Sequence, residues 1–294
     1  GAGGFSTGAT MAGCRVIWAA NHWPAAVAVH ADNHPDTQHA CQDLHQCDWT
    51  RVPAHDLLLA SPACQGHTRA RGKERPHHDA ARSTAWAVVG AAESHRPQAV
   101  VVENVPEFAR WTLYPAWCAA MTALGYALAP HIVDAADCGV PQHRRRLIIV
   151  GTRSKHPCEL RLPKRDHVVA RSVIDFADGN WASIKRHGRS AATLARIAAG
   201  RRAHGDRFLV AYYGNEHGGR SLQRPIGTIT TRDRWAVIDG DRMRMITVPE
   251  ARRAMSFPDG YKLPANGGEA MHMLGNAVPP LMARSVVEAL KVAA

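Results

Sequence analysis

The stretch DLLLASPACQ, residues 56–65, is a short apolar run that leads directly into a proline turn and a cysteine. An apolar run this short, bounded by turn residues, is typical of a strand buried in a sheet. Similar runs lie at 14–20, 98–102, 127–133 and 147–151, and helical patterns lie between them at 24–33, 79–95 and 115–124. This alternation predicts an α/β fold built on a doubly wound sheet.

Cys64 follows the end of a predicted strand. Ligands of open α/β sheets bind beyond the carboxyl ends of the strands, so we expect Cys64 to face the crevice there. A packed, inert cysteine is the alternative, and it is the usual fate of this residue type. Glu103 follows the run at 98–102, and the cationic stretch 142–146 (QHRRR) precedes the run at 147–151. Taken singly, these could be a solvated carboxylate and a basic surface turn.

The composition bounds the class of protein. Lys and Arg number 36 against 25 Asp and Glu, and a net charge of +11 favours a polyanionic partner such as nucleic acid. No apolar run reaches eighteen residues and no signal peptide is visible, so we expect a cytoplasmic protein with no membrane partner. The seven cysteines lack zinc-like spacing, and we expect no metal. His30 and His34 are interpreted as surface histidines.

The amino-acid composition of the sequence changes at about residue 152. From there to about 223 strand signals thin out and Arg, Lys, His and Gly cluster. We therefore predict a catalytic and cofactor-binding domain over 1–151, a small irregular lobe over 152–223, and a return segment over 224–294 that completes the first domain. A glycine turn such as GAGG at 1–4 normally follows a strand, so we expect that the first strand of the fold is missing from this sequence.

Five ordered motifs resemble those of the DNA (cytosine-5)-methyltransferase family. They are SPACQ at 61–65, Glu103-Asn104-Val105, the set Gln142, Arg144 and Arg146, the opening glycines, and GNAVPP at 275–280. The segments 224–231 and 247–261 are also similar to the family. The resemblance covers nearly the whole chain except about 152–223, where the family places its variable target recognition domain. It departs from the family at Ala63, where a second proline is common, and at Asn21 or His22, where an acidic residue usually holds the cofactor ribose.

The resemblance implies a Rossmann-like class I methyltransferase with a small, irregular target recognition lobe. Such an enzyme transfers a methyl group from S-adenosyl-L-methionine to C5 of cytosine in double-stranded DNA and releases S-adenosyl-L-homocysteine. Its nucleophile attacks C6 of a flipped-out base. The implied catalytic residues are Cys64, Glu103, Arg144 and Arg146. The implied cofactor-binding residues are Gly1, Ala2, Gly3, Gly4, Phe5, Asn21, His22, Asp43, Leu44, Pro62, Asn276, Ala277 and Val278. The implied substrate-binding residues are Gln65, Asn104, Gln142, Arg224, Thr230 and Thr231.

Two other readings stay open. One branch of the same family methylates cytosine in tRNA, but Pro106-Glu107-Phe108 lacks the Cys-Phe-Thr signature of that branch. A DNA-binding homologue with impaired catalysis is opposed by the intact motifs, whereas Asn21 and the expected missing strand favour it. For the enzyme reading we expect a monomeric, bacterial or phage-encoded protein of the nucleoid, with a cognate restriction endonuclease as an optional partner.

Overall fold

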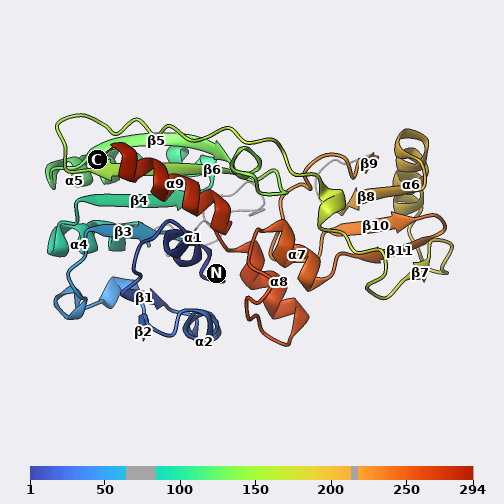
Figure 1. The fold of residues 1–294 in the computed structure, drawn as a ribbon, viewed down its shortest axis with the longest axis horizontal. Helices are drawn as coiled ribbons and strands as arrows, with labels where there is room; N and C mark the ends of the chain where they lie inside the picture. The colour runs from blue at the N-terminus through green and yellow to red at the C-terminus, as the bar shows by residue number, and fades with distance from the viewer. Residues whose placement is uncertain (64–83, 213–217, 294) are drawn as a thin grey trace. The chain divides into compact units, whose positions relative to one another are not determined.

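The computed structural model describes residues 1–63, 84–212 and 218–293, and it divides into two compact units. The sheet unit comprises Phe5–Asp134, Arg145–Pro163 and Ala283–Ala294. The lobe unit comprises Gly1–Gly4, Ala135–Arg144 and Lys164–Met282. Figure 1 labels the helices and strands of both units.

The sheet unit holds a four-stranded sheet in the order β3-β4-β6-β5. Strand β3 (Leu57–Ala60) runs parallel to β4 (Ala99–Asn104), and β6 (Arg145–Thr152) lies antiparallel to both β4 and β5 (Ala127–Asp134). Two further strands, β1 (Trp18–Asn21) and β2 (Gln38–Cys41), form a parallel pair. Strands surrounded by helices in this way confirm the predicted α/β fold.

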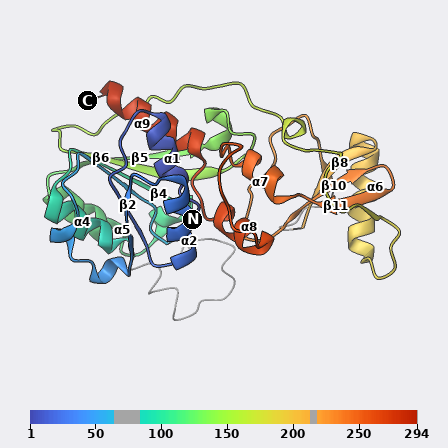
Figure 2. The same cartoon turned by 60° about the horizontal axis from the view of Figure 1, so that its bottom comes forward.

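Helices cover both faces of the four-stranded sheet. The helices α4 (Trp86–His95) and α5 (Tyr114–Ala123), with the 3₁₀ turn η4 (Pro106–Arg110), pack against alternate residues of β4 and β6. The other face of the sheet is also buried, and Figures 1 and 2 place α9 (Pro280–Ala293) over it. In the two central strands neither face meets water over residues 100–102 and 147–150, so these stretches are apolar throughout rather than alternating.

Local sequence signals set the ends of several elements. Helix α2 (Pro24–Asn33) begins with proline in its first turn, where no hydrogen-bond donor is lost, and it ends just before His34-Pro35. Helix α5 stops at Gly125, whose φ of +92° is readily adopted by glycine alone. The strand expected at 14–20 is shorter and later, because β1 pairs only with the four residues of β2. Helix α1 (Gly4–Met11) follows the opening glycines.

The lobe unit contains a second, antiparallel sheet in the order β7-β11-β10-β8-β9. Its strands are β7 (Ala182–Ser183), β8 (Arg207–Ala211), β9 (Gly219–Arg220), β10 (Trp235–Asp239) and β11 (Arg242–Met245). Helix α6 (Ala191–His204) packs closely on it, since a Cβ built on Gly200 would lie 2.3 Å from the Phe208 ring. The expected boundary at 223 falls between β9 and β10, so residues on both sides of it build this one sheet.

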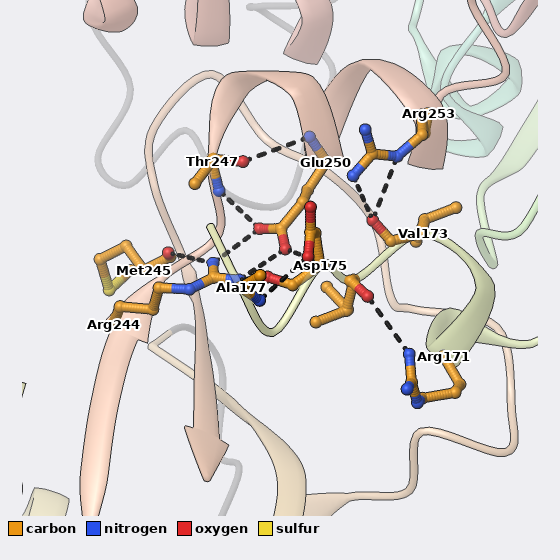
Figure 3. A network of polar contacts seen from close by, with 10 residues as sticks. Arg171, Val173, Asp175, Ala177, Arg244, Met245, Thr247, Glu250 and Arg253 are labelled. Carbon is orange, nitrogen blue, oxygen red and sulfur yellow. Dashed lines mark hydrogen bonds and ion pairs between the residues drawn. The ribbon is translucent and has the colours of Figure 1, made fainter. Parts of the chain in front are cut away.

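A buried ion pair joins β11 to α7 (Val248–Ala254) within the lobe unit. Arg244 donates to both carboxylate oxygens of Glu250 at 2.7 Å, and both side chains are almost fully buried. Glu250 also accepts from the backbone N–H groups of Thr247 and Asp175, each at 2.8 Å (Figure 3). The carboxylate is thus fully bonded, as a buried charge requires. Helix α8 (Gly267–Gly275) completes this part of the chain.

The remaining described elements are short 3₁₀ turns. They are η1 (Leu44–Gln46), η2 (Trp49–Arg51), η5 (Ala135–Cys138) and η6 (Ala170–Ser172). Within the described ranges, no helix is long and apolar enough to cross a membrane.

Candidate active site

The turn before Cys64 is tied to the end of the neighbouring strand. Because β3 and β4 are parallel, with Ala60 opposite Val102, the segments that follow them leave the sheet at the same edge. There Asn104 donates from Nδ2 to the carbonyl oxygen of Pro62 at 3.2 Å, and its Oδ1 accepts from the N–H of Val105 at 2.9 Å. Asn104 is buried. Cys64 and Gln65 themselves lie outside the described residues.

Glu103 and Arg146 form an ion pair at this edge. Glu103 lies opposite Ile148 in the antiparallel pairing of β4 and β6, so Arg146 is its diagonal neighbour on the same face of the sheet. The Nε atom of Arg146 lies 2.9 Å from Oε1 of Glu103, and their side chains are only 13% and 11% exposed. A carboxylate this well shielded from water needs such a partner. The structure therefore brings together two of the four residues implied to be catalytic.

Arg144 and Gln142 make structural contacts inside the lobe unit. Arg144 is buried and donates to the carbonyl oxygens of Ile229, Gly275 and Ala277 at 2.9, 2.8 and 3.0 Å. Gln142 is fully buried, and its Oε1 accepts from the N–H of Ile229 at 2.8 Å. The resemblance implied a catalytic role for Arg144 and a substrate-binding role for Gln142. In this structure both side chains hold backbone segments of the lobe unit together, and the two implied roles stay predictions.

The opening glycines pack against residues 276–278 in the lobe unit. A Cβ on Gly1 would lie 2.6 Å from the carbonyl oxygen of Asn276, and one on Gly4 would lie 1.8 Å from that of Val278. Both distances are too short for any side chain, so close backbone approach requires glycine at these positions. Gly3 has a φ of +78°, which glycine adopts without strain. Two segments at opposite ends of the chain, both implied to bind cofactor, therefore lie side by side.

Other residues implied to bind cofactor or substrate in the lobe unit have mixed surroundings. Ala2 is buried, and its carbonyl oxygen accepts from the hydroxyl of Tyr261. Asn276 is exposed, whereas Ala277 and Val278 are buried. The backbone of Thr230 and Thr231 lies against Gly275, where a Cβ would come within 2.5 Å of it. Arg224 is exposed.

In the sheet unit, Asn21 and Asp43 lie at one edge of the parallel pair β1–β2. Asn21 ends β1 opposite Cys41, and the N–H of Gln42 donates to the carbonyl oxygen of Asn21 at 3.1 Å. The Oδ1 atoms of Asn21 and Asp43 accept from the N–H groups of Trp23 and His45 at 2.9 and 3.0 Å. Each side chain has a second polar atom, so this edge can bind the hydroxyl or amino groups of a nucleoside. The neighbouring residues His22, Leu44 and Phe5 are exposed, half-buried and half-buried.

The sequence analysis missed a cluster of histidines in the sheet unit. His30 is buried, so the expectation of a surface histidine is wrong for this residue. Its Nδ1 lies 2.7 Å from Nε2 of His39, and its Nε2 lies 2.8 Å from Oγ of Ser6. Burial, with the nearby rings of His34 and His39, lowers the pKa of His30 to about 3. The i, i+4 spacing of His30 and His34 was the one sequence signal for this cluster, and it did not indicate that His39 belongs to it. No group of residues in the described part of the chain is arranged to hold a metal ion.

Solved structures share this fold, which is that of a class I methyltransferase. A prophage-encoded E. coli protein, described as a DNA modification methyltransferase, superposes with a TM-score of 0.73 and 18% identity, covering 100% of this chain and 97% of that one. The methyltransferase EhMeth of Entamoeba histolytica superposes with a TM-score of 0.68 and 13% identity, covering 99% and 95%.

The sequence comparisons narrow the class to a family. The model of the C-5 cytosine-specific DNA methylase family matches residues 1–292, so the chain belongs to that family. The Type II methyltransferase M.NlaX of Neisseria lactamica is 25% identical, over 91% of this chain and 86% of its own length. The Type II methyltransferase M.HhaI of Haemophilus parahaemolyticus is 24% identical, over 95% and 88%.

Proposed function

We propose that this protein methylates C5 of cytosine in double-stranded DNA, with S-adenosylmethionine as methyl donor and Cys64 as covalent nucleophile. The observation that carries the proposal is the hydrogen bond from Asn104 to Pro62. It holds the turn before Cys64 beside the end of β4, which bears Glu103, the ion-pair partner of Arg146 on β6. The family and its Type II relatives support DNA as the substrate.

The chemistry requires a nucleophile because C5 of cytosine reacts poorly by itself. The Cys64 thiolate adds to C6, forming an S–C6 bond and moving electron density onto C5. Glu103 donates a proton or hydrogen bond at N3, where negative charge develops, and Arg146 fixes the orientation of its carboxyl group. After C5 has gained the methyl group, its proton passes to water, the S–C6 bond breaks with release of the thiolate, and N3 returns to Glu103 any proton that it received. The base must leave the stack for any of these groups to reach it.

The residues present fit the proposed cofactor. S-adenosylmethionine supplies a methyl group from a sulfonium, which leaves as a neutral thioether. Asn21 and Asp43 would hold its nucleoside part at the β1–β2 edge of the sheet unit. Asn21 gives hydroxyl groups a neutral hydrogen bond instead of the stronger charge-assisted bond of an acidic residue.

The lobe is proposed to read the DNA target. The region from 152 to 223 carries Lys185, Arg186, Arg189, Arg196, Arg201, Arg202 and Arg207. Cations of this kind contact phosphates and set affinity, while a few residues at base edges set specificity. Lys185, Arg186 and Arg202 are exposed. Arg201 and Arg207 pair with Asp241 and Asp239 at 3.1 and 2.7 Å. The three exposed cations are therefore better suited to phosphate contacts than these two paired ones.

A trapping experiment tests the nucleophile. A duplex made with 5-fluorocytosine in place of every cytosine contains the target, whatever its sequence, and the fluorine blocks release of the enzyme. With S-adenosylmethionine we expect a covalent adduct for the wild type and none for Cys64→Ser, which should still bind DNA. Cys158→Ser is the matched control and should react like the wild type. An adduct with Cys64→Ser, or one attached through another cysteine, would overturn the assignment.

A further inference from the structure

One peptide group, that between Pro62 and Ala63, is held by side chains on both of its polar atoms. Its carbonyl oxygen accepts from Nδ2 of Asn104 at 3.2 Å, and its N–H donates to Oγ1 of Thr84 at 2.9 Å. The two side chains come from different elements. Asn104 ends β4, and Thr84 precedes α4. Because a peptide group is planar, fixing both of these atoms fixes the orientation of the whole plane.

Both side chains that hold this peptide group are attached to backbone that is anchored in the core. The residue after Thr84 is Ala85, which is fully buried and accepts a hydrogen bond from Nε1 of the buried Trp117 at 2.9 Å. Asn104 belongs to the ladder of β4 and β6, where it lies opposite Leu147. Groups held by rigid elements position a reacting atom more sharply than groups on unsupported loops.

We propose that Thr84 is a positioning residue for the nucleophile, acting with Asn104 through the Pro62–Ala63 peptide group. Ala63 is bonded directly to Cys64, so fixing that peptide plane fixes the N and Cα atoms of Ala63, from which the chain continues to the nucleophile. The hydroxyl of Thr84 is the part that acts, as hydrogen-bond acceptor for the N–H of Ala63. The inference rests on the proposed function, because it takes Cys64 to be the attacking residue.

The test compares substitutions that keep or remove this hydroxyl in the full chain. Thr84→Val keeps the shape of the side chain and removes the acceptor, whereas Thr84→Ser keeps the acceptor. Thr122→Val is the matched control, since Thr122 is exposed on α5 in the same unit. For each protein we would measure the single-turnover rate of methyl transfer, the rate of adduct formation with the 5-fluorocytosine duplex, the Kd for DNA and for S-adenosylmethionine, and the Tm.

We expect Thr84→Val to slow methyl transfer and adduct formation by about 10–100-fold, the effect of a small displacement of a reacting group. Both Kd values and the Tm should stay close to those of the wild type. Thr84→Ser should keep the rate within about threefold, and Thr122→Val should be unaffected. Asn104→Asp gives a second line of evidence, since it keeps the acceptor for Val105 and loses the donor to Pro62, and it should be slow as well.

The possible results separate the positioning role from the proposed function. Wild-type rates for Thr84→Val, or equal losses for Thr84→Ser and Thr84→Val, would overturn the role of Thr84 while leaving Cys64 as nucleophile. A loss that simply follows a lower Tm in both Thr84→Val and Asn104→Asp would overturn it too. A wild-type protein that forms no adduct would overturn the proposed function, and the positioning role with it.

Discussion

The guanidinium of Arg146 contacts the carboxylate of Glu103 across two antiparallel strands, with 2.9 Å between Nε and Oε1. Neither residue could be replaced by a neighbour along its own strand, because adjacent residues of a strand point to opposite faces of the sheet. The pair therefore depends on the register of β4 and β6, in which Glu103 lies opposite Ile148.

Glu103→Gln should lower the single-turnover rate of methyl transfer by at least about 100-fold, because an amide cannot transfer a proton to the ring. The Tm should fall by less than in Glu250→Gln, since the side chain of Arg146 is 13% exposed and keeps its hydrogen bond to the carbonyl oxygen of Arg145. The control is Glu288→Gln, which alters a half-buried pair with Arg284 in the same unit and should leave the rate unchanged. A fully active Glu103→Gln protein would exclude proton transfer by Glu103.

Glu250→Gln should lower the free energy of unfolding by about 3–5 kcal/mol, because it leaves the buried charge of Arg244 without its partner. Urea unfolding measures this loss. Asp241→Asn alters the exposed pair with Arg201 and should cost at most about 1 kcal/mol. If both variants showed the same small decrease in the free energy of unfolding, the Arg244–Glu250 pair would not stabilise the lobe unit.

The protein should lose stability as the pH falls below about 6.5, partly through His30. Its pKa is lowered to about 3 in the folded chain, so between these values the unfolded chain binds a proton that the folded chain does not. The free energy of unfolding then rises with pH, by at most about 1.4 kcal/mol per unit for one such group. The slope should be full above pH 3 and vanish above about 6.5.

His30→Gln removes this titration and should flatten the dependence of stability on pH between about 4 and 6. Ser6, His34 and His39 face His30 in the folded chain. His22→Gln changes an exposed histidine and should leave the slope as it is. An unchanged slope in His30→Gln would mean that His30 is accessible to protons in the folded chain.

Arg186→Gln should weaken binding to all DNA duplexes alike and reduce the salt dependence of the affinity by about one unit of slope. Fluorescence anisotropy at several salt concentrations measures both. Arg161→Gln makes the same change in net charge in the sheet unit, at an exposed residue that pairs with Glu159. If the two variants gave the same slope, the effect would come from net charge and not from a phosphate contact in the lobe.

The sequence predicted the edge of the sheet at which Pro62 and Asn104 meet, because apolar runs reveal strands and parallel strands end at a common edge. It could not predict the partners of Arg144 and Gln142. The acceptors of Arg144 lie 85–133 residues further along the chain, and no local pattern encodes such contacts. The same holds for Thr84, 21 residues from Ala63, and for His39 beside His30. The sheet of the lobe unit was also missed, since β7 and β9 have only two residues each.

The hydrogen bonds from Arg144 to three distant carbonyl groups affect the order in which the chain can fold during synthesis. Gly275 and Ala277 leave the ribosome 131 and 133 residues after Arg144, a delay on the order of ten seconds at ordinary rates of synthesis. During that time the guanidinium has neither of these acceptors, so the nascent lobe unit cannot close. Its closure is therefore a late event in biogenesis, and a chain stalled before residue 275 should be especially sensitive to proteases.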